Sequence, residues 1–195
     1  MQATTLSFSN IHAHGPLFTE LLRARHRTFI VDKHWDLPQS DGMEFDQYDT
    51  PASRWVAVHA PGRVLAGLRL TPTTHRCGIY SYMIRDAQAG LLPTIPEDLL
   101  DGPAPVSETV WECTRGFIAP EIEGRDRLVI HRRLNQEMVR AARELGARNV
   151  LAIVPATAPR LLRRVGLDVS AAGPVRDIGG VDNLCIDIAL GDKMH

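Results

Sequence analysis

A charged residue among apolar ones is the first candidate for chemistry in this sequence. Arg25 falls in the apolar line of an expected helix, one turn from both Leu21 and Phe29. A cation on an apolar face needs an anionic partner or a ligand, because burying an unpaired charge is costly. Segment 32–49 holds six acids and one lysine, so negative charge is concentrated shortly after this helix.

A second candidate pair lies in an expected strand, residues 110–118. Glu112 can act as a general base, directly or through a water, because a positioned carboxylate can accept a proton from an ammonium group. A structural salt bridge to an arginine is the alternative. Arg115 can bind a carboxylate through two parallel hydrogen bonds, which lysine does less well. Residues three apart in a strand point to opposite faces, so joint action of this pair requires a β-bulge near Thr114-Arg115-Gly116.

Composition favours one domain and excludes several classes of function. The chain has 195 residues, 44% of them hydrophobic, which predicts a single domain over residues 1–195. No apolar run approaches the roughly 20 residues that span a bilayer, and no signal-peptide pattern opens the chain, so we expect a cytoplasmic protein. The net charge of −1 argues against general nucleic-acid binding. Three widely spaced cysteines form no metal-ligand pair, and no metal is expected.

Apolar periodicity predicts the secondary structure. A first amphipathic helix follows Gly15-Pro16 and carries Phe18, Leu21, Leu22 and Phe29 at helical spacing. Segment 31–50 is expected to be a long ordered loop, and segment 71–108 an irregular stretch with one short helix. The other expected elements are strands 54–59, 64–70, 110–118, 149–154 and 184–190 and helices 125–145 and 158–165.

The order of these elements predicts the fold class. A helix and a β-meander are followed by strand, helix, strand, helix and strand, which fits an α/β fold, an α+β sandwich of one sheet with helices on both faces. Alternation in strand 64–70 leaves Arg69 on one face. The residues expected on the other face are Val64, Ala66, Leu68 and Leu70.

The stretch from Asp41 to Asp49 reads DGMEFDQYD and resembles the acidic loop of LuxI-type acyl-homoserine-lactone synthases, also called autoinducer synthases. Further parts of the family pattern occur in the expected order, over about residues 21–166 of the chain. They are Arg25 and Phe29 in an Arg-x-x-x-Phe helix, Trp35, the paired Asp46 and Asp49, Arg69 at a strand end, and Glu112 with Arg115 in a Glu-x-x-Arg strand. The resemblance implies a fold similar to that of the N-acetyltransferases of the GNAT class.

The resemblance also implies a reaction in two steps. The α-amine of S-adenosylmethionine attacks an acyl thioester, and the methionyl carboxylate then displaces methylthioadenosine to close an acyl-homoserine lactone, a quorum-sensing signal. S-adenosylmethionine carries a sulfonium, an ammonium and a carboxylate, so a site of several acids and arginines matches its charges better than an apolar cleft does. It is a substrate, and no cofactor is expected.

Specific roles follow from the matched positions. Asp46 and Asp49 are expected to pair with Arg25 and Arg69 and to shape the pocket, the alternative being a solvated acidic loop. Phe29 and Trp35 are expected to form an aromatic wall around the adenosyl group, unless both are ordinary core residues, and Arg115 to bind the substrate carboxylate. Trp55 and Trp111 are expected in the core. The expected catalytic residues are Glu112, Arg115, Arg25, Asp46, Asp49 and Arg69.

The acyl donor is expected to be acyl carrier protein or acyl-coenzyme A. The glycine loop with which GNAT proteins hold phosphate is poorly represented in segment 121–125, which has one glycine and two acids, and this favours the carrier protein. Segment 115–164 has eleven arginines against five acids, enough for a docking surface for an acidic carrier protein, although a solvated helix face explains many of them equally well. The arginines concerned are Arg125, Arg127, Arg132, Arg133, Arg140, Arg143, Arg160, Arg163 and Arg164. No nucleic acid or membrane partner is expected.

The acyl chain needs an apolar tunnel. Leu134, Met138, Leu151 and Ile153 are expected to line it, or else to be ordinary core residues. Synthases of 3-oxo products often resemble one another in a serine or threonine near the position of Ala152, and strand 149–154 has no hydroxyl. We therefore expect thioesters unsubstituted at C3 to be the better substrates.

Two other functions fit the same sequence features. One is a GNAT-like enzyme that acylates a free amino acid and leaves a linear product. The other is a catalytically silent relative that only binds an acyl thioester or a carrier protein. The full set of six charged residues argues against the silent relative, because binding alone does not require all of them.

Overall fold

The computed structural model describes residues 1–191, which form two compact units. The first comprises residues 1–70 and 115–141, and the second residues 71–114 and the chain from 142 onward. Three elements run from one unit into the other: β5 (Arg63–Pro72), β6 (Val110–Ile118) and α3 (Gly124–Glu144). The single domain over residues 1–195 stays a prediction. No helix within residues 1–191 combines the length and the apolarity needed to cross a bilayer.

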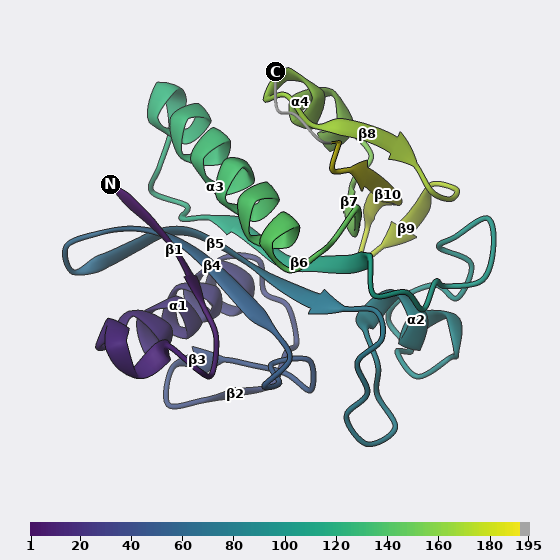
Figure 1. The fold of residues 1–195 in the computed structure, drawn as a ribbon, viewed down its shortest axis with the longest axis horizontal. Helices are drawn as coiled ribbons and strands as arrows, with labels where there is room; N and C mark the ends of the chain where they lie inside the picture. The colour runs from purple at the N-terminus through teal and green to yellow at the C-terminus, as the bar shows by residue number, and fades with distance from the viewer. Residues whose placement is uncertain (192–195) are drawn as a thin grey trace. The chain divides into compact units, whose positions relative to one another are not determined.

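The first unit is a sheet with a helix on each face (Figure 1). Strands β1 (Gln2–Leu6), β4 (Arg54–Ala60), β5 and β6 hydrogen-bond in that order. Helix α1 (Leu17–Arg25) packs on one face, where its Leu21 joins a buried cluster with Trp55 of β4. Helix α3 lies on the other face, where Thr5 of β1 donates a hydrogen bond to Glu137 of α3. The expected sheet with helices on both faces is confirmed in this unit.

The predicted first helix is present, but its winding changes from α-helical to π-helical after Arg25. A 3-10 turn, η1 (Ile11–His14), precedes α1, which ends at Arg25 and continues directly as a π-helix, η2 (His26–Asp32). Leu21, Leu22 and Phe29 are buried, and Arg25 is only 1% exposed among them. The apolar line with an embedded cation is therefore confirmed.

Segment 31–50 is more regular than the predicted loop, because it contains a short hairpin. The hairpin pairs β2 (Gln39–Ser40) with β3 (Met43–Glu44). Asp41 and Gly42 join the two strands with φ values of 52° and 71°. Two successive residues with positive φ form the tight turn that matches the twist of a hairpin. The hairpin places Glu44 at the start of the acidic loop, in a fully buried position.

The pairing of β4 with β5 shows that one residue, Val64, lies on the other face of the sheet from the one predicted. Leu68 pairs with Val56 and Ala66 with Val58, while Arg69 pairs with Trp55, so alternation holds for these residues. The register shifts between Val58 and His59. Beyond this irregularity Val64 packs in the cluster on the α1 side, so its predicted place beside Ala66 and Leu68 was wrong.

Strand β6 contains the irregularity that the sequence required. The amide of Thr73 donates to the carbonyl of Val110, and the amide of Ala119 donates to the carbonyl of Leu65. Between these two hydrogen bonds β5 advances by eight residues, from Leu65 to Thr73, while β6 advances by nine, from Val110 to Ala119. One extra residue on one strand of an antiparallel pair is a β-bulge. Arg115 has a φ of 53°. The irregular conformation thus falls on Arg115 itself and not on Gly116, and the ion pairs of Arg115 described below offset a strain of about 1–3 kcal/mol.

The second unit continues from β6 into a sheet of mixed direction. Strand β7 (Asn149–Pro155) pairs with β6 in parallel and with β10 (Val181–Ala189) in the antiparallel sense. Two strands of this unit, β8 (Asp168–Ala171) and β9 (Arg176–Ile178), were not predicted from the sequence because each is short or only partly apolar. The same is true of β1 in the first unit. The two predicted helices in this unit are α2 (Met83–Gln88) and α4 (Ala158–Arg164).

An apolar cluster covers one face of the second unit's sheet. Leu151 of β7 and Cys185 of β10 are buried there against Tyr82, Ile84 and other residues of the α2 region, with Ile153 packed beside them. Two of the four residues predicted to line an acyl tunnel, Leu151 and Ile153, therefore meet in this unit. The other two, Leu134 and Met138, are buried on α3 within the first unit.

The close approach of α1 to the sheet leads to a stability prediction. A Cβ added at Gly67 would lie 2.5 Å from Cδ1 of Leu21 and 2.9 Å from Cε1 of Phe117. We expect Gly67→Ala to lower the free energy of unfolding by about 1–3 kcal/mol, because overpacking forces side chains out of place. Gly116→Ala is the control, since a Cβ there meets nothing within 4 Å. Equal urea midpoints for Gly67→Ala and wild type would contradict this packing.

Candidate active site

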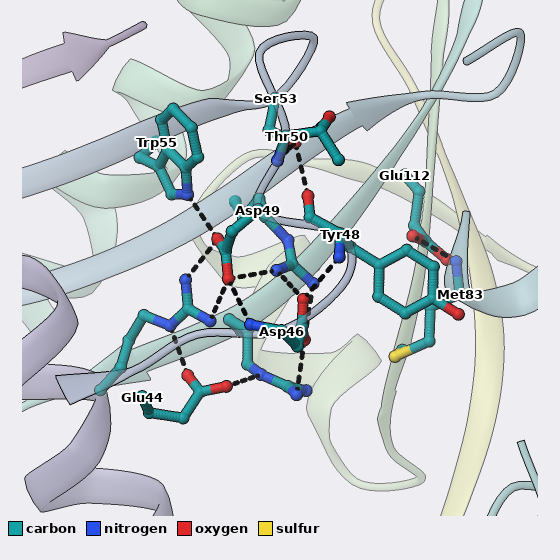
Figure 2. Close-up of polar contacts among 12 residues, drawn as sticks. Glu44, Asp46, Tyr48, Asp49, Thr50, Ser53, Trp55, Met83 and Glu112 are labelled. Atoms are coloured by element: carbon teal, nitrogen blue, oxygen red, sulfur yellow. Dashed lines mark hydrogen bonds and ion pairs between the residues drawn. The ribbon is translucent and has the colours of Figure 1, made fainter. Parts of the chain in front are cut away.

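Six charged side chains form one connected ion-pair network in the first unit (Figure 2). Three are arginines and three are carboxylates, so the formal charges cancel. The side chains are at most 10% exposed. The members are Arg25, Arg69, Arg115, Glu44, Asp46 and Asp49.

Glu44 and Asp46 each link two of the arginines. Glu44 accepts hydrogen bonds from Nε of Arg25 at 2.5 Å and from Nε of Arg115 at 3.1 Å. Asp46 accepts from Nη1 of Arg69 at 2.5 Å and from Nη2 of Arg115 at 2.7 Å. Each carboxylate is therefore bonded on both oxygens by charged donors, the strongest class of hydrogen bond in proteins.

Asp49 is the most heavily bonded acid of the network. It receives two parallel bonds from Arg25, at 2.7 and 2.9 Å, and lies 2.9 Å from Nη1 of Arg69. The indole N–H of Trp55 donates to Asp49 at 2.7 Å, and so does the backbone amide of Asp46 at 2.9 Å. Figure 2 shows Trp55 and Asp46 approaching Asp49 from different sides.

Electrostatics keep Asp46, Asp49 and Arg69 ionised at neutral pH. Burial alone would raise the pKa values of Asp46 and Asp49, but the positive charge of Arg69, with Arg115 at Asp46 and Arg25 at Asp49, holds both below the ordinary range. Burial alone would lower the pKa of Arg69, and the two aspartates raise it above its usual value. These three groups are thus fixed charges near pH 7.

Local hydrogen bonds fix the backbone of the acidic loop. Oδ1 of Asp46 accepts the amide of Tyr48 at 2.9 Å, which closes a turn. The hydroxyl of Ser53 donates to the carbonyl of Tyr48 at 2.6 Å and accepts the amide of Thr50 (Figure 2). These bonds bring Asp46 and Asp49 to the same side of the loop, so the alternative of a solvated acidic loop is wrong.

Arg115 retains donors for a ligand. Its Nε and Nη2 bond to Glu44 and Asp46, and within residues 1–191 its Nη1 makes no hydrogen bond. The guanidinium also lies 5.9 Å from the ring centroid of Phe29. A guanidinium held on one edge by two acids presents the other N–H groups in a fixed direction.

Phe29 and Trp35 form a stacked pair but differ in burial. Their ring centroids lie 5.1 Å apart with planes 13° from parallel. Phe29 is 1% exposed and belongs to the core, whereas Trp35 is 45% exposed. The ammonium of Lys33 lies 5.2 Å from the centroid of Phe29 and 4.9 Å from that of Trp35, so the pair already attracts a cation.

Glu112 lies in the second unit and caps the start of α2. Its oxygens accept the amides of Met83 at 3.0 Å and Ile84 at 2.7 Å, the first of which Figure 2 shows. Glu112 is fully buried and pairs across the sheet with Leu151. A negative charge stabilises the first turn of a helix. The sequence did not predict this capping contact.

Two neighbours of Glu112 are held in their neutral forms. Burial and the nearby charge of Glu112 raise the pKa of Tyr82 far above its ordinary value. The same two causes raise the pKa of the Cys185 thiol to about 12. Cys185 is therefore a protonated, unreactive thiol at neutral pH.

The nine arginines proposed for docking lie on two helices. Five of them, Arg125 to Arg140, lie in the part of α3 that belongs to the first unit, and all five are exposed. The other four lie in the second unit, Arg143 in the last turn of α3 and Arg160, Arg163 and Arg164 on α4. Arg140 pairs with Glu137, and Arg163 donates to the carbonyl of Val169.

Sequence reasoning missed two members of the site. Glu44 stands in the acidic loop without the Asp-x-x-Asp spacing that marked its neighbours, and only its two arginine partners reveal it. Trp55 was predicted as a core residue and is fully buried, but its N–H also holds Asp49. A buried tryptophan needs a partner for its N–H, and that need was the available signal. Trp111, also predicted in the core, is 6% exposed.

Comparison with known proteins places the chain in a family. A family model described as autoinducer synthase matches residues 10–189. The chain belongs to the autoinducer synthase family. An acyl-homoserine-lactone synthase of Ralstonia nicotianae is 35% identical over 166 residues, which cover 82% of this chain and 76% of the relative. Another, from Aeromonas salmonicida, is 31% identical over 192 residues, which cover 93% and 84% of the two chains.

A solved structure agrees with the fold. TofI, in a ternary complex with an inhibitor and MTA, is similar to this chain with a TM-score of 0.79 and 26% identity. The similarity covers 100% of this chain and 94% of TofI. The predicted GNAT-like α/β fold and the resemblance to LuxI-type synthases are both confirmed.

The network of this autoinducer synthase predicts a pH-dependent stability. We expect Asp49→Asn to lower the free energy of unfolding by about 3–5 kcal/mol at pH 7, because it leaves buried arginines without their partner. Asp49 has a lowered pKa in the folded state, so its contribution is fully present above the unfolded value of about 4, declines below that value, and is lost as pH falls through the folded pKa. The difference between variant and wild type should therefore shrink below about pH 4.

Urea unfolding at pH 7 and pH 3 measures this difference. Asp36→Asn is the control, since Asp36 is exposed in the same acidic segment. A destabilisation by Asp49→Asn that is equal at both pH values would contradict the ionised network.

Proposed function

We propose that this autoinducer synthase is an acyltransferase that makes an acyl-homoserine lactone from S-adenosylmethionine and an acyl thioester. The α-amine attacks the thioester carbonyl, a C–N bond forms, and the C–S bond to the carrier breaks. The methionyl carboxylate then attacks the carbon next to the sulfonium, which closes the lactone and expels methylthioadenosine. The observation that carries this proposal is the buried, charge-balanced network in a family of acyl-homoserine-lactone synthases.

The network suits S-adenosylmethionine because it presents both signs of charge in fixed places. Arg115 is the proposed partner of the substrate carboxylate, through the Nη1 group that bonds to nothing within the described residues. Trp35, the exposed ring of the stacked pair, is proposed to hold the adenosyl group, with the buried Phe29 stacked against its other face. No cofactor is proposed, since S-adenosylmethionine is consumed as a substrate.

Glu112 is the proposed general base for the first step, which needs a neutral amine. Each of its oxygens already accepts a backbone amide, and a carboxylate oxygen can accept a second hydrogen bond. The proton therefore passes to Glu112 directly or through one water. Its capping of α2 is a second, structural role.

Acyl carrier protein is the proposed donor, with acyl-coenzyme A as the alternative. The exposed arginines of α3 and α4 support an acidic protein partner. We place the reaction in the cytoplasm. The competing functions are a linear-product synthase and a silent binder, neither of which releases methylthioadenosine.

Product analysis tests the reaction. Purified protein given S-adenosylmethionine and a carrier thioester should release methylthioadenosine and acyl lactone in equal amounts, because lactone closure expels the nucleoside. Chromatography with mass detection measures both, and omission of the thioester is the control. Release of free thiol without methylthioadenosine would instead identify a linear-product enzyme, and no turnover a silent binder.

Salt dependence tests the donor. KM for the carrier thioester should rise with salt more steeply than KM for S-adenosylmethionine, because exposed charges are screened within about 10 Å at 0.1 M salt. The double variant Arg132→Gln/Arg133→Gln should flatten that rise, whereas Arg63→Gln, at an exposed position on β5, should not. Equal salt responses of the two KM values, or a preference for acyl-coenzyme A, would refute carrier docking.

Paired substrates test the acyl pocket. Thioesters unsubstituted at C3 should have a kcat/KM roughly 5-fold or more above that of their 3-oxo analogues of equal length, since an unpartnered oxygen costs about 1 kcal/mol or more. Strand β7 offers no hydroxyl to bond that oxygen. Competition assays give the ratio directly, and a ratio that favours the 3-oxo form would show that another group supplies the donor.

A further inference from the structure

One buried hydroxyl of the second unit lacks a partner within residues 1–191. Thr71 of β5 is fully buried, and its Oγ1 makes no hydrogen bond within the described residues. Two other buried polar atoms share this property, Nε2 of His75 and Nε1 of Trp111. An unmade hydrogen bond in a protein interior is costly, so such an atom needs a reason.

The register of the sheet places Thr71 beside Glu112. The amide of Thr73 donates to the carbonyl of Val110 at 3.2 Å, which makes these two residues an antiparallel pair. In an antiparallel pair, two residues back along β5 correspond to two residues forward along β6, so Thr71 lies opposite Glu112. Directly opposed residues share a face of the sheet. Pro72 falls between the two bonded pairs, where no amide is needed.

The same row continues into the apolar cluster. Glu112 pairs with Leu151 on its other side, and Leu151 packs with Tyr82 and Cys185. Trp111 precedes Glu112 in β6 and so faces the opposite side, while His75 lies beyond the end of β5. Of the three unpartnered atoms, only the hydroxyl of Thr71 lies in the row with the proposed base.

We propose that the hydroxyl of Thr71 is a catalytic group that donates a hydrogen bond to the thioester carbonyl oxygen during acyl transfer. This inference rests on the proposed function. When the amine attacks, the C–N bond forms and the carbonyl π electrons move to oxygen, which becomes an alkoxide. The alkoxide then re-forms the carbonyl and expels the thiolate, which takes the second proton from the attacking nitrogen, while the proton that Glu112 took from the ammonium is released to solvent.

The local chemistry favours this role. The proposed base carries no donor when ionised, and the hydroxyl of Tyr82 already donates to the carbonyl of Pro105 at 2.7 Å. Thr71 is the neutral donor next to the base, held by a strand and needing no reorganisation. Its unmade bond in the free enzyme is then a cost that substrate binding removes.

The variant Thr71→Val tests this because it keeps the shape and removes the hydroxyl. We expect kcat for acyl transfer to fall roughly 10- to 100-fold with both KM values within about twofold of wild type, since the bond is made mainly in the transition state. The melting temperature should stay the same or rise, because a buried unpaired hydroxyl has been removed. Thr71→Ser should recover most of kcat, and Thr74→Val, on an exposed turn, should leave it unchanged.

A preformed acyl-S-adenosylmethionine isolates the second step. Thr71→Val should convert it to lactone and methylthioadenosine at the wild-type rate, because lactone closure has no thioester oxygen. An unchanged kcat in Thr71→Val would show that the hydroxyl only binds water, and a loss confined to 3-oxo substrates would move its contact to C3. Either result overturns the proposal. If the wild-type enzyme releases no methylthioadenosine, either from S-adenosylmethionine with a thioester or from acyl-S-adenosylmethionine, the proposed function is overturned, and this inference with it.

Discussion

The first unit depends on the burial of three guanidinium groups together with three carboxylates. Removing one such ion from water costs several kcal/mol even after relaxation, and the cost is recovered only when every charge is paired with good geometry. The network meets this condition with bonds of 2.5–3.2 Å on Asp46, Asp49 and Glu44. Loss of any one group leaves an unpaired charge in the interior, so the six residues act as a unit.

Several elements of the fold hold these charged side chains close together. The cation of Arg25 is carried on the apolar side of α1, the β2–β3 hairpin delivers Glu44, and the turn at Tyr48 orients the two aspartates. The bulge in β6 puts Arg115 in a left-handed conformation that a non-glycine residue rarely adopts. Backbone strain at Arg115 is offset by its two ion pairs, which links the covalent geometry of the strand to the charge pattern of the site.

The sequence predicted those parts of the structure that follow from periodicity or from one strong physical conflict. The limits of α3 and β6 were predicted within a residue of those observed, because their apolar patterns are long. The need of Arg25 for an anionic partner and the bulge near Arg115 were both predictable, since each follows from a rule that the chain would otherwise break.

The parts that escaped prediction depend on contacts between residues distant in sequence. Nothing local marks Glu44 as a bridge, Trp55 as a donor to Asp49, or Glu112 as the cap of α2, because each partner is supplied by tertiary packing. The same holds for the unpartnered hydroxyl of Thr71, since only the register of β5 and β6 sets it beside Glu112.

The claim that the charges act as a unit is tested most directly by a double-mutant cycle on Arg25 and Asp49. Urea unfolding of Arg25→Met, Asp49→Asn and the double variant at pH 7 gives the coupling free energy between the two side chains. Joint stabilisation of the two charges predicts a coupling free energy of at least about 1 kcal/mol, with the double variant clearly more stable than the sum of the two single losses implies. Additive losses, within about 0.5 kcal/mol, would mean that the two residues are stabilised independently and would contradict the account.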